Sequence, residues 1–277
     1  MKAIASVQRT NEILNKYGLR AKKGYGQNFI IDSNIVENIA LKSECEDACV
    51  IEIGPGMGVL SKRIVPLSGH TILFEIDYRL ESILKRELEG NDNYTLVIGD
   101  FLDINIKEYV AEFSFKKIYV VANLPYYITS LIVKKITTEL YPDKMVIMVQ
   151  NEVADRLSAT VNHSDYGYIT VWLNSYYDIV KEFIVDRRFF TPSPNVDSAV
   201  ISMVKNNKLS EKRENFDRLI SDAFRYKRKN LKNNLKIYNI DVINKILNEN
   251  GLNLSNRAEE IPLKVFISLS KADIFKN

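Results

Sequence analysis

The sequence has few of the residues that build disulfide frameworks, metal sites or membrane spans. It contains only two cysteines, Cys45 and Cys49, and two histidines among its 277 residues. These are too few and too scattered for a disulfide framework or a zinc site. No segment approaches the roughly 18 apolar residues of a membrane helix, and the start lacks the apolar stretch of a secretion signal. We therefore expect a cytoplasmic protein with no membrane contact and no metal ion.

An average composition excludes disordered, collagen-like and coiled-coil proteins. Hydrophobic residues make up 46% of the chain and charged residues 26%, as in folded soluble proteins. The net charge of +3 hides two basic segments. Residues 1–23 hold six Lys/Arg against one Glu, and residues 205–236 hold eleven Lys/Arg against four acids. Such segments favour the binding of a polyanion, although a solvated, lysine-rich surface would have the same composition.

Short apolar runs alternate with helical stretches between residues 49 and 157. The runs predict strands at 49–53, 71–75, 94–98, 118–122 and 145–149. Strands separated by helices form mostly parallel sheets with both faces covered, so the pattern indicates the α/β class. Three further runs, 169–176, 179–185 and 199–204, follow without intervening helices. We expect them to extend the edge of the sheet as antiparallel strands.

The chain changes character near residue 205, after the last predicted strand. A polar joint at 205–208 is followed by helical patterns at 216–226, 229–238 and 241–249 and from residue 262 onward. We therefore predict two domains. Residues 1–206 form the α/β domain, which begins with a basic arm, and residues 207–277 form a small all-helical domain.

A glycine-rich turn follows the first predicted strand. Gly54, Gly56 and Gly58 stand between that strand and a short helix, where glycine lets a ligand approach the backbone. Glu75 ends the second strand, 21 residues after Gly54, where a carboxylate can accept hydrogen bonds from both hydroxyls of a ribose. The two features indicate a cofactor that contains a nucleoside. They do not distinguish a nicotinamide dinucleotide from other cofactors of this kind.

Polar residues also follow the third and fourth predicted strands. Asp100 follows the third strand, where its carboxylate can accept a hydrogen bond from an adenine amino group. The tetrapeptide Asn123-Leu124-Pro125-Tyr126 follows the fourth. Its Asn amide oxygen and a backbone carbonyl beside Pro can accept hydrogen bonds from an exocyclic amine, and the Tyr ring can stack on a base. At this place in the order of strands, the tetrapeptide favours chemistry on an amino group of a nucleobase.

With these motifs the chain resembles S-adenosyl-L-methionine-dependent adenine-N6 methyltransferases that act on RNA. It is most similar to the family of ribosomal small-subunit adenine dimethyltransferases. The resemblance extends over residues 10–270, and the segments that carry it are 26–30, 51–58, 123–129, 190–200, 224–235 and 257–262. It implies a Rossmann-like methyltransferase domain with a mostly parallel, seven-stranded sheet, followed by a small C-terminal helical domain. One departure is Tyr127, at a position where the family usually has Asn.

The resemblance also implies which residues form the site. S-adenosyl-L-methionine would be the methyl donor, and the residues at this cofactor would be Asn28, Ile30, Gly54, Glu75, Asp100 and Asn123. The catalytic residues would be Asn123, Leu124, Pro125, Tyr126 and Phe190. Methyl transfer to N6 would depend mainly on positioning, with Asn123 and the Pro125 carbonyl accepting hydrogen bonds from the N6 protons. The rings of Tyr126 and Phe190 would stack on the target base, and no strong general base or metal would be required.

The helical domain is implied to bind RNA through its basic segment. The expected contacts are Arg225, Lys227, Arg228, Lys229 and Lys232. On a continuous helix, four basic residues from Arg225 to Lys236 would share one face and meet phosphates. The implied activity is dimethylation of N6 on two adjacent adenosines near the 3′ end of 16S rRNA, within the small ribosomal subunit or its precursor. We expect the protein to be a monomer.

Four alternatives remain at this stage. A macrolide-resistance-type enzyme would methylate adenine in 23S rRNA with the same catalytic loop, but segments 190–200 and 257–260 resemble the small-subunit family. A DNA adenine methyltransferase would need a domain that reads bases, and the sequence shows no such domain. An NAD-dependent oxidoreductase would need a proton-shuttling group at the nicotinamide, and no candidate for that group stands out in the sequence. A non-catalytic ribosome-assembly factor would have the same basic surface, although the intact tetrapeptide at 123–126 argues that catalysis is retained.

Overall fold

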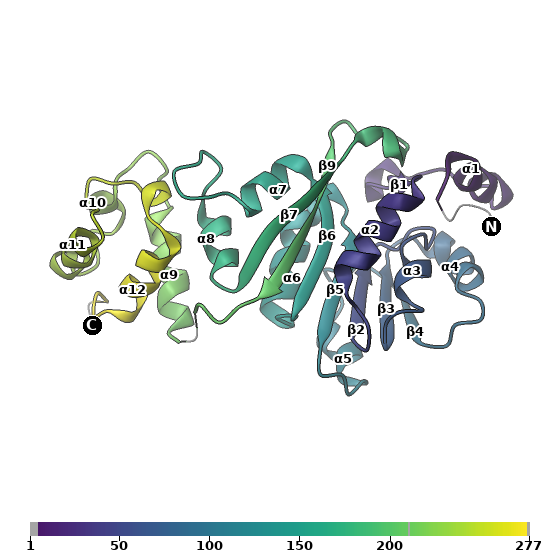
Figure 1. Ribbon diagram of the computed structural model, residues 1–277, viewed down its shortest axis with the longest axis horizontal. Coiled ribbons are helices and arrows are strands. Elements are labelled where there is room, and N and C mark those ends of the chain that lie inside the picture. The colour runs from purple at the N-terminus through teal and green to yellow at the C-terminus, as the bar shows by residue number, and fades with distance from the viewer. Residues whose placement is uncertain (1–4, 210, 276–277) are drawn as a thin grey trace. The chain divides into compact units, whose positions relative to one another are not determined.

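The computed structural model describes residues 5–209 and 211–275, which group into two units (Figure 1). The first unit contains residues 5–154 and 180–204, and the second contains residues 155–179 and 205–275 without residue 210. The second junction lies close to the boundary expected at residue 206, whereas residues 155–179, expected in the first domain, group with the second unit. No helix among the described residues is long and apolar enough to cross a membrane.

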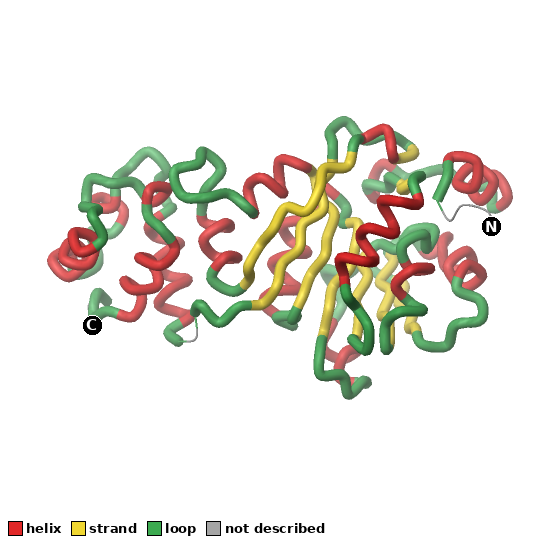
Figure 2. The backbone as a smooth tube through the Cα atoms, in the orientation of Figure 1, coloured by secondary structure: helices red, strands yellow, loops and turns green. Residues whose placement is uncertain are grey.

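The first unit is built on a seven-stranded sheet, whose strands are yellow in Figure 2. Their spatial order is β4-β3-β2-β5-β6-β9-β7. These strands are β2 (Cys49–Ile53), β3 (His70–Glu75), β4 (Tyr94–Ile98), β5 (Ile118–Asn123), β6 (Lys144–Gln150), β7 (Tyr177–Val185) and β9 (Ser198–Lys205). A separate two-stranded sheet pairs β1 (Phe29–Ile30) antiparallel with β8 (Phe190–Thr191).

The pairing confirms a mostly parallel sheet. Strands β2 to β6 pair in parallel, and β9 pairs antiparallel with β6. The five strands expected before residue 150 are confirmed, and so are the strands expected at 179–185 and 199–204. The strand order reverses between β2 and β5, because β3 and β4 continue on one side and β6 on the other. In open α/β sheets a ligand crevice forms at such a reversal, outside the carboxyl ends of the strands.

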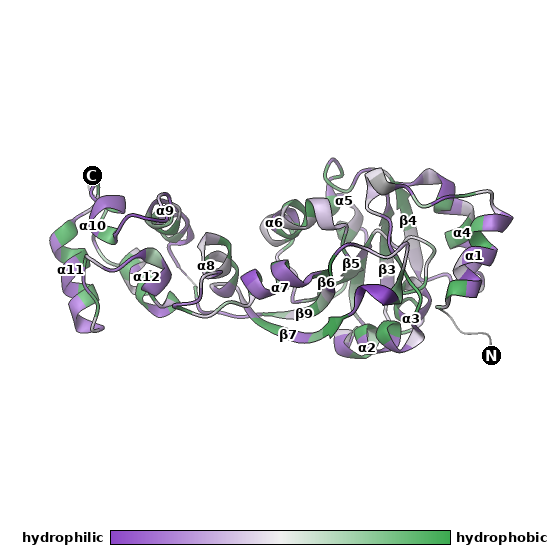
Figure 3. Ribbon diagram, turned by 90° about the horizontal axis from the view of Figure 1, so that it is seen from above, coloured by the Kyte–Doolittle hydropathy of each residue, from purple (hydrophilic) through white to green (hydrophobic). Residues whose placement is uncertain are grey.

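Helices cover both faces of this sheet. Helices α2 (Ser33–Ser43) and α3 (Ser61–Ile64) lie on one face, and α5 (Ile106–Ala111) and α6 (Thr129–Glu139) lie on the other (Figures 1 and 3). Every side chain of β2 is buried, as expected for a strand that is covered on both faces. Figure 3 shows the hydrophobic green of the central strands. The other helices that begin in this unit are α1 (Val7–Lys16), α4 (Glu81–Glu87) and α7 (Asn151–Leu157).

One predicted strand is a helix in the structure. The pattern at 169–176 predicts a strand, but α8 (Tyr168–Asn174) occupies this segment. Four consecutive residues of α8, 170–173, are buried, so the sequence shows no polar positions at helical spacing. Its β-branched and aromatic residues then favour a strand assignment. The Tyr166 hydroxyl, just before α8, donates to the Ile261 carbonyl at 3.0 Å, which joins this segment to the second unit.

The second unit is a cluster of helices around its own core. Its further helices are α9 (Arg213–Ala223), α10 (Leu231–Asn234), α11 (Ile240–Glu249) and α12 (Leu263–Lys271). Helix α9 contacts α8, α10 and α12, and the buried core includes Phe216, Ile220 and Phe266. The basic segment is not one helix, because a turn at 224–230 separates α9 from α10. The prediction that basic residues from Arg225 to Lys236 share one helix face is therefore wrong.

Candidate active site

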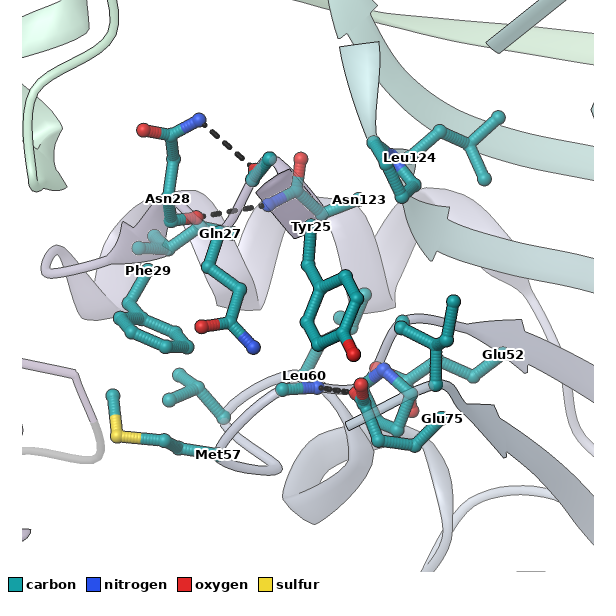
Figure 4. Close-up of a pocket in the computed structure, with 18 of the residues that line it drawn as sticks. Tyr25, Gln27, Asn28, Phe29, Glu52, Met57, Leu60, Glu75, Asn123 and Leu124 are labelled. Carbon is teal, nitrogen blue, oxygen red and sulfur yellow. Dashed lines mark hydrogen bonds between the residues drawn. The ribbon is translucent and has the colours of Figure 1, made fainter. Parts of the chain in front are cut away.

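A pocket lies at the carboxyl edge of the sheet, where the strand order reverses. It is lined by residues at the ends of β2, β3 and β5 and by the segment that leads into β1 (Figure 4). The predicted site residues that meet there are Asn28, Ile30, Gly54, Glu75, Asn123, Leu124, Pro125 and Tyr126. The fold thus brings together, in one pocket, residues that four separate segments of the sequence contribute.

The turn after β2 has a backbone conformation that requires glycine. Gly54, Gly56 and Gly58 have φ angles of 67°, 60° and 76°, in the left-handed region that residues with a Cβ rarely adopt. A Cβ at Gly56 would also come within 3.3 Å of the Phe29 ring. The Gly56 N–H donates to Glu75 Oε2 at 2.9 Å, so the turn is fixed against the end of β3 (Figure 4).

Glu75 is held at the pocket by backbone hydrogen bonds. Its Oε1 accepts from the Asp77 N–H at 2.9 Å, and the residue is only 3% exposed. Burial raises the pKa of Glu75, although the N–H groups of Asp77 and Gly56 favour its ionised form. A carboxylate oxygen can accept more than one hydrogen bond, so Glu75 retains the capacity to accept from two hydroxyls. This arrangement fits the ribose expected at this position.

Glu52 is a second carboxyl group in the pocket, and the sequence motifs predict no role for it. It lies within β2, and its Oε2 is buried without a hydrogen-bond partner among the described residues. Burial raises the pKa of Glu52 to about 8. The sequence does mark Glu52, because it is the single carboxylate inside the apolar run Cys49–Ile53. An unpaired charge in a buried strand is costly, so a carboxylate there is a candidate for a functional residue.

Asn123 presents an unpaired acceptor in the pocket. It is the last residue of β5, and its Nδ2 donates to the Asn28 carbonyl at 3.4 Å (Figure 4). Its Oδ1 is buried and has no hydrogen-bond partner within the described part of the chain. Buried acceptors are normally paired, so an unpaired one in a pocket indicates that a ligand N–H completes it. An exocyclic amine has the matching chemistry.

The loop after β5 is braced by hydrogen bonds. The hydroxyls of Tyr126 and Ser198 are 2.5 Å apart, and burial raises the pKa of Tyr126. The Pro125 carbonyl accepts from the Ile128 N–H at 3.3 Å and from the Thr129 hydroxyl at 3.0 Å. Its lone pairs are therefore engaged by the turn that begins α6. The expectation that this carbonyl accepts a proton of the target amine disagrees with the structure.

Two of the predicted cofactor-binding and catalytic residues lie outside the pocket lining. Asp100 follows β4 at the same edge of the sheet, and its Oδ1 accepts from the Leu102 N–H at 2.9 Å. Phe190 pairs with Ile30 in the two-stranded sheet and is only 3% exposed, in a core shared with α2. The expectation of a free stacking face on Phe190 is corrected by this burial. The neighbouring Phe189 is the more exposed of the two rings.

The predicted RNA contacts lie in the second unit, on the turn between α9 and α10 and on α10 itself. Four of them are exposed and form no ion pair with any described residue: Lys227, Arg228, Lys229 and Lys232. Arg225 differs, because its Nη2 donates to Asp222 Oδ1 at 2.5 Å. Tyr226, which is not among the predicted RNA contacts, is 61% exposed among these cations. The signal for it is an aromatic residue inside a basic run.

Comparison with known proteins decides the family. Residues 18–273 match the family described as Ribosomal RNA adenine dimethylase. The chain belongs to this family. It is 40% identical to Ribosomal RNA small subunit methyltransferase A of Listeria monocytogenes, over 97% of this chain and 96% of the relative. It is 38% identical to the protein of the same name from a Geobacillus species, over 98% of each chain.

Solved structures have the same fold. A dimethyladenosine transferase from Plasmodium falciparum matches with a TM-score of 0.73 at 23% identity, over 89% of this chain and 99% of the other. The 23S rRNA methyltransferase ErmE matches with a TM-score of 0.72 at 25% identity, over 88% and 98% of the two chains. These matches and the sheet order confirm the expected Rossmann-like methyltransferase fold.

Proposed function

We propose that this protein transfers methyl groups from S-adenosyl-L-methionine to N6 of two adjacent adenosines near the 3′ end of 16S rRNA. The observation that carries the proposal is the Oδ1 of Asn123, which has no hydrogen-bond partner among the described residues and lies in the pocket of a ribosomal RNA adenine dimethylase. The names of relatives at 38–40% identity support the RNA of the small subunit as the substrate. We propose that the enzyme acts on it within the small subunit or its precursor. The protein works as a monomer in the cytoplasm.

The pocket residues have the chemistry to hold S-adenosyl-L-methionine. Glu75, which retains acceptor capacity, would bind the ribose hydroxyls, and Asp100 at the neighbouring strand end would accept from the adenine amine. Asn28, Ile30 and Gly54 would enclose the remainder of the cofactor. When bound, this cofactor supplies a methyl group that is activated by a positively charged sulfur.

Asn123 positions the amine that accepts the methyl group. The N6 lone pair of adenine is delocalised into the ring, so the planar amine is a weak nucleophile. An N6–H that donates to Asn123 Oδ1 favours a pyramidal nitrogen and fixes its approach. Tyr126, braced by Ser198, forms a wall for the base, and Leu124 contributes to the pocket lining. The product ammonium loses its proton to water, so no strong general base is required.

The basic turn of the second unit supports the binding of a folded RNA. Its four exposed cations are not neutralised by described acids, and phosphate contacts of this kind recognise the shape of an RNA more than its sequence. Tyr226 adds an exposed ring on which an unpaired base can stack. Arg225 contributes less to phosphate binding, because Asp222 already neutralises its charge.

Methyl transfer from labelled S-adenosyl-L-methionine to three acceptors tests the proposal. The acceptors are small ribosomal subunits that lack adenine dimethylation, 23S rRNA and a DNA duplex. We expect label only on two adjacent adenosines near the 3′ end of 16S rRNA. Label on 23S rRNA would assign the protein to the macrolide-resistance type. No label on any acceptor, with cofactor binding intact, would favour a non-catalytic assembly factor.

A further inference from the structure

Two loops that are distant in the sequence meet beside the pocket. Residues 22–28 are named the N-terminal loop, and residues 123–128 the catalytic loop. The first link between them is the hydrogen bond from Asn123 Nδ2 to the Asn28 carbonyl. The second is a contact between the ring of Tyr127 and Gly26, since a Cβ added to Gly26 would lie 3.2 Å from Cδ1 and Cε1 of that ring.

The contact with Tyr127 depends on glycine at position 26. Gly26 has a φ of 62°, and the absence of a side chain lets the ring approach its backbone. Tyr127 is otherwise 56% exposed and does not line the pocket. Burial raises the pKa of Tyr127, and the nearby Asp100 and Tyr25 raise it further.

The N-terminal loop is also fixed to the residues that follow β3. Gln27 Oε1 accepts from the Lys22 N–H at 2.8 Å, and Gln27 Nε2 donates to Asp77 Oδ2 at 2.9 Å. Hydrogen bonds from Arg79 lower the pKa of Asp77 to about 2. Asp77 therefore remains an ionised acceptor at neutral pH, and this side of the loop stays anchored.

We infer that Tyr127 is a positioning residue that holds the N-terminal loop closed over the cofactor pocket. The inference rests on the proposed function, since the loop contributes Tyr25, Gln27 and Asn28 to that pocket (Figure 4). Gln27 anchors the loop at Asp77, and strand β1, which follows the loop, pairs with β8. The side of the loop that faces the catalytic loop has the two links described above. The hydrogen bond to the Asn28 carbonyl is long at 3.4 Å, and the close approach of the Tyr127 ring to Gly26 adds a second support.

An exposed ring in the catalytic loop has one competing role, which is to stack on a base of the RNA. The two roles change different quantities. Loss of a loop support raises the Kd for the cofactor without RNA, because less of the protein is in the conformation that binds it. Loss of a stacking surface raises the KM for the RNA and leaves the cofactor Kd unchanged.

Calorimetric titration of S-adenosyl-L-methionine into the full chain tests the inference. Tyr127→Asn replaces the ring by a short polar side chain, which an exposed loop tolerates. We expect its cofactor Kd to rise about fivefold, with faster release of the cofactor. Tyr127→Phe keeps the ring and should restore the wild-type Kd. Leu131→Asn is the matched control, because this side chain of α6 is equally exposed at 55%.

Gly26→Ala provides an independent variant. Its Cβ would push the N-terminal loop away from the ring, so the cofactor Kd should rise as in Tyr127→Asn. Thermal unfolding without cofactor checks that each variant is folded. An unchanged Kd in both variants, while the wild type binds, would overturn the inference. A raised KM for small subunits with unchanged Kd would also overturn it and assign Tyr127 to the RNA. Absence of binding by the wild type would refute the proposed function, and the inference with it.

Discussion

Asn123→Ala should separate catalysis from stability. The Oδ1 of Asn123 is buried and unpaired within the described residues, and its Nδ2 makes one long hydrogen bond of 3.4 Å to Asn28. A buried polar group without a partner costs about 1–3 kcal/mol, so deleting it relieves a cost as much as it removes an interaction. We therefore expect the free energy of unfolding to change by less than about 1 kcal/mol, in either direction.

The same substitution should nearly abolish methyl transfer. If Oδ1 positions the amine, its deletion removes one preorganised hydrogen bond of the transition state. Such a loss typically lowers kcat by about 10²–10³, or about 3–4 kcal/mol. Binding of the cofactor should change little, because Glu75 and the glycine turn remain. The assay is the initial rate on small subunits at saturating labelled cofactor, with urea unfolding of the same preparation.

Asn93→Ala is the matched control for this experiment. The Nδ2 of Asn93 donates to the carbonyls of Val65 at 2.8 Å and Ser68 at 3.0 Å, and the residue is not part of the pocket lining. Its removal should lower the free energy of unfolding by about 1–3 kcal/mol and leave kcat unchanged. The reasoning would be refuted if Asn123→Ala kept more than about a tenth of the wild-type kcat, or lost as much stability as Asn93→Ala.

Three further predictions concern the cofactor, the RNA and pH. Glu75→Ala should raise the cofactor Kd at least about tenfold in calorimetry, since it removes the acceptors for the ribose; an unchanged Kd would place the ribose elsewhere. Lys229→Gln with Lys232→Gln should reduce the slope of log K against log salt for RNA binding by about 1.4–1.8, whereas Lys85→Gln, a lysine already paired with a glutamate, should not. Because the pKa of Glu52 is raised to about 8, the folded protein keeps a proton that the unfolded chain releases above about pH 4.5. The free energy of unfolding should therefore fall by up to about 1.4 kcal/mol per pH unit as the pH rises from about 4.5 to about 8. Urea unfolding at about pH 5.5 and 7.5 should show this loss of stability in the wild type and not in Glu52→Gln.

Much of the first unit could be predicted from local patterns. Its parallel strands are short apolar runs between helices, and each is confirmed within a residue or two. The glycine turn and Glu75 are recognisable because backbone conformation and strand ends leave local marks in the sequence. The strand prediction at 169–176 is wrong for the same reason, since the four consecutive buried residues 170–173 of α8 leave no helical periodicity in the sequence.

The sequence predicts which residues form the site better than it predicts their burial and hydrogen bonds. Eight of the predicted residues do line one pocket. Burial removed Phe190 from the accessible surface, and the turn into α6 engaged the Pro125 carbonyl. The burial of Phe190 depends on contacts with segments far from it in the sequence. The engagement of the Pro125 carbonyl depends on the local turn that Ile128 and Thr129 form at the start of α6.

The sequence by itself determined which strand ends carry Glu75, Asp100 and Asn123, because strand periodicity and turn chemistry are properties of neighbouring residues. Only the tertiary structure decided that Asn123 Oδ1 is buried with no partner in the described part of the chain, and that the ring of Tyr127 approaches Gly26. The physical reason is that burial and pairing of a side chain depend on segments far along the chain, whose approach the sheet topology controls.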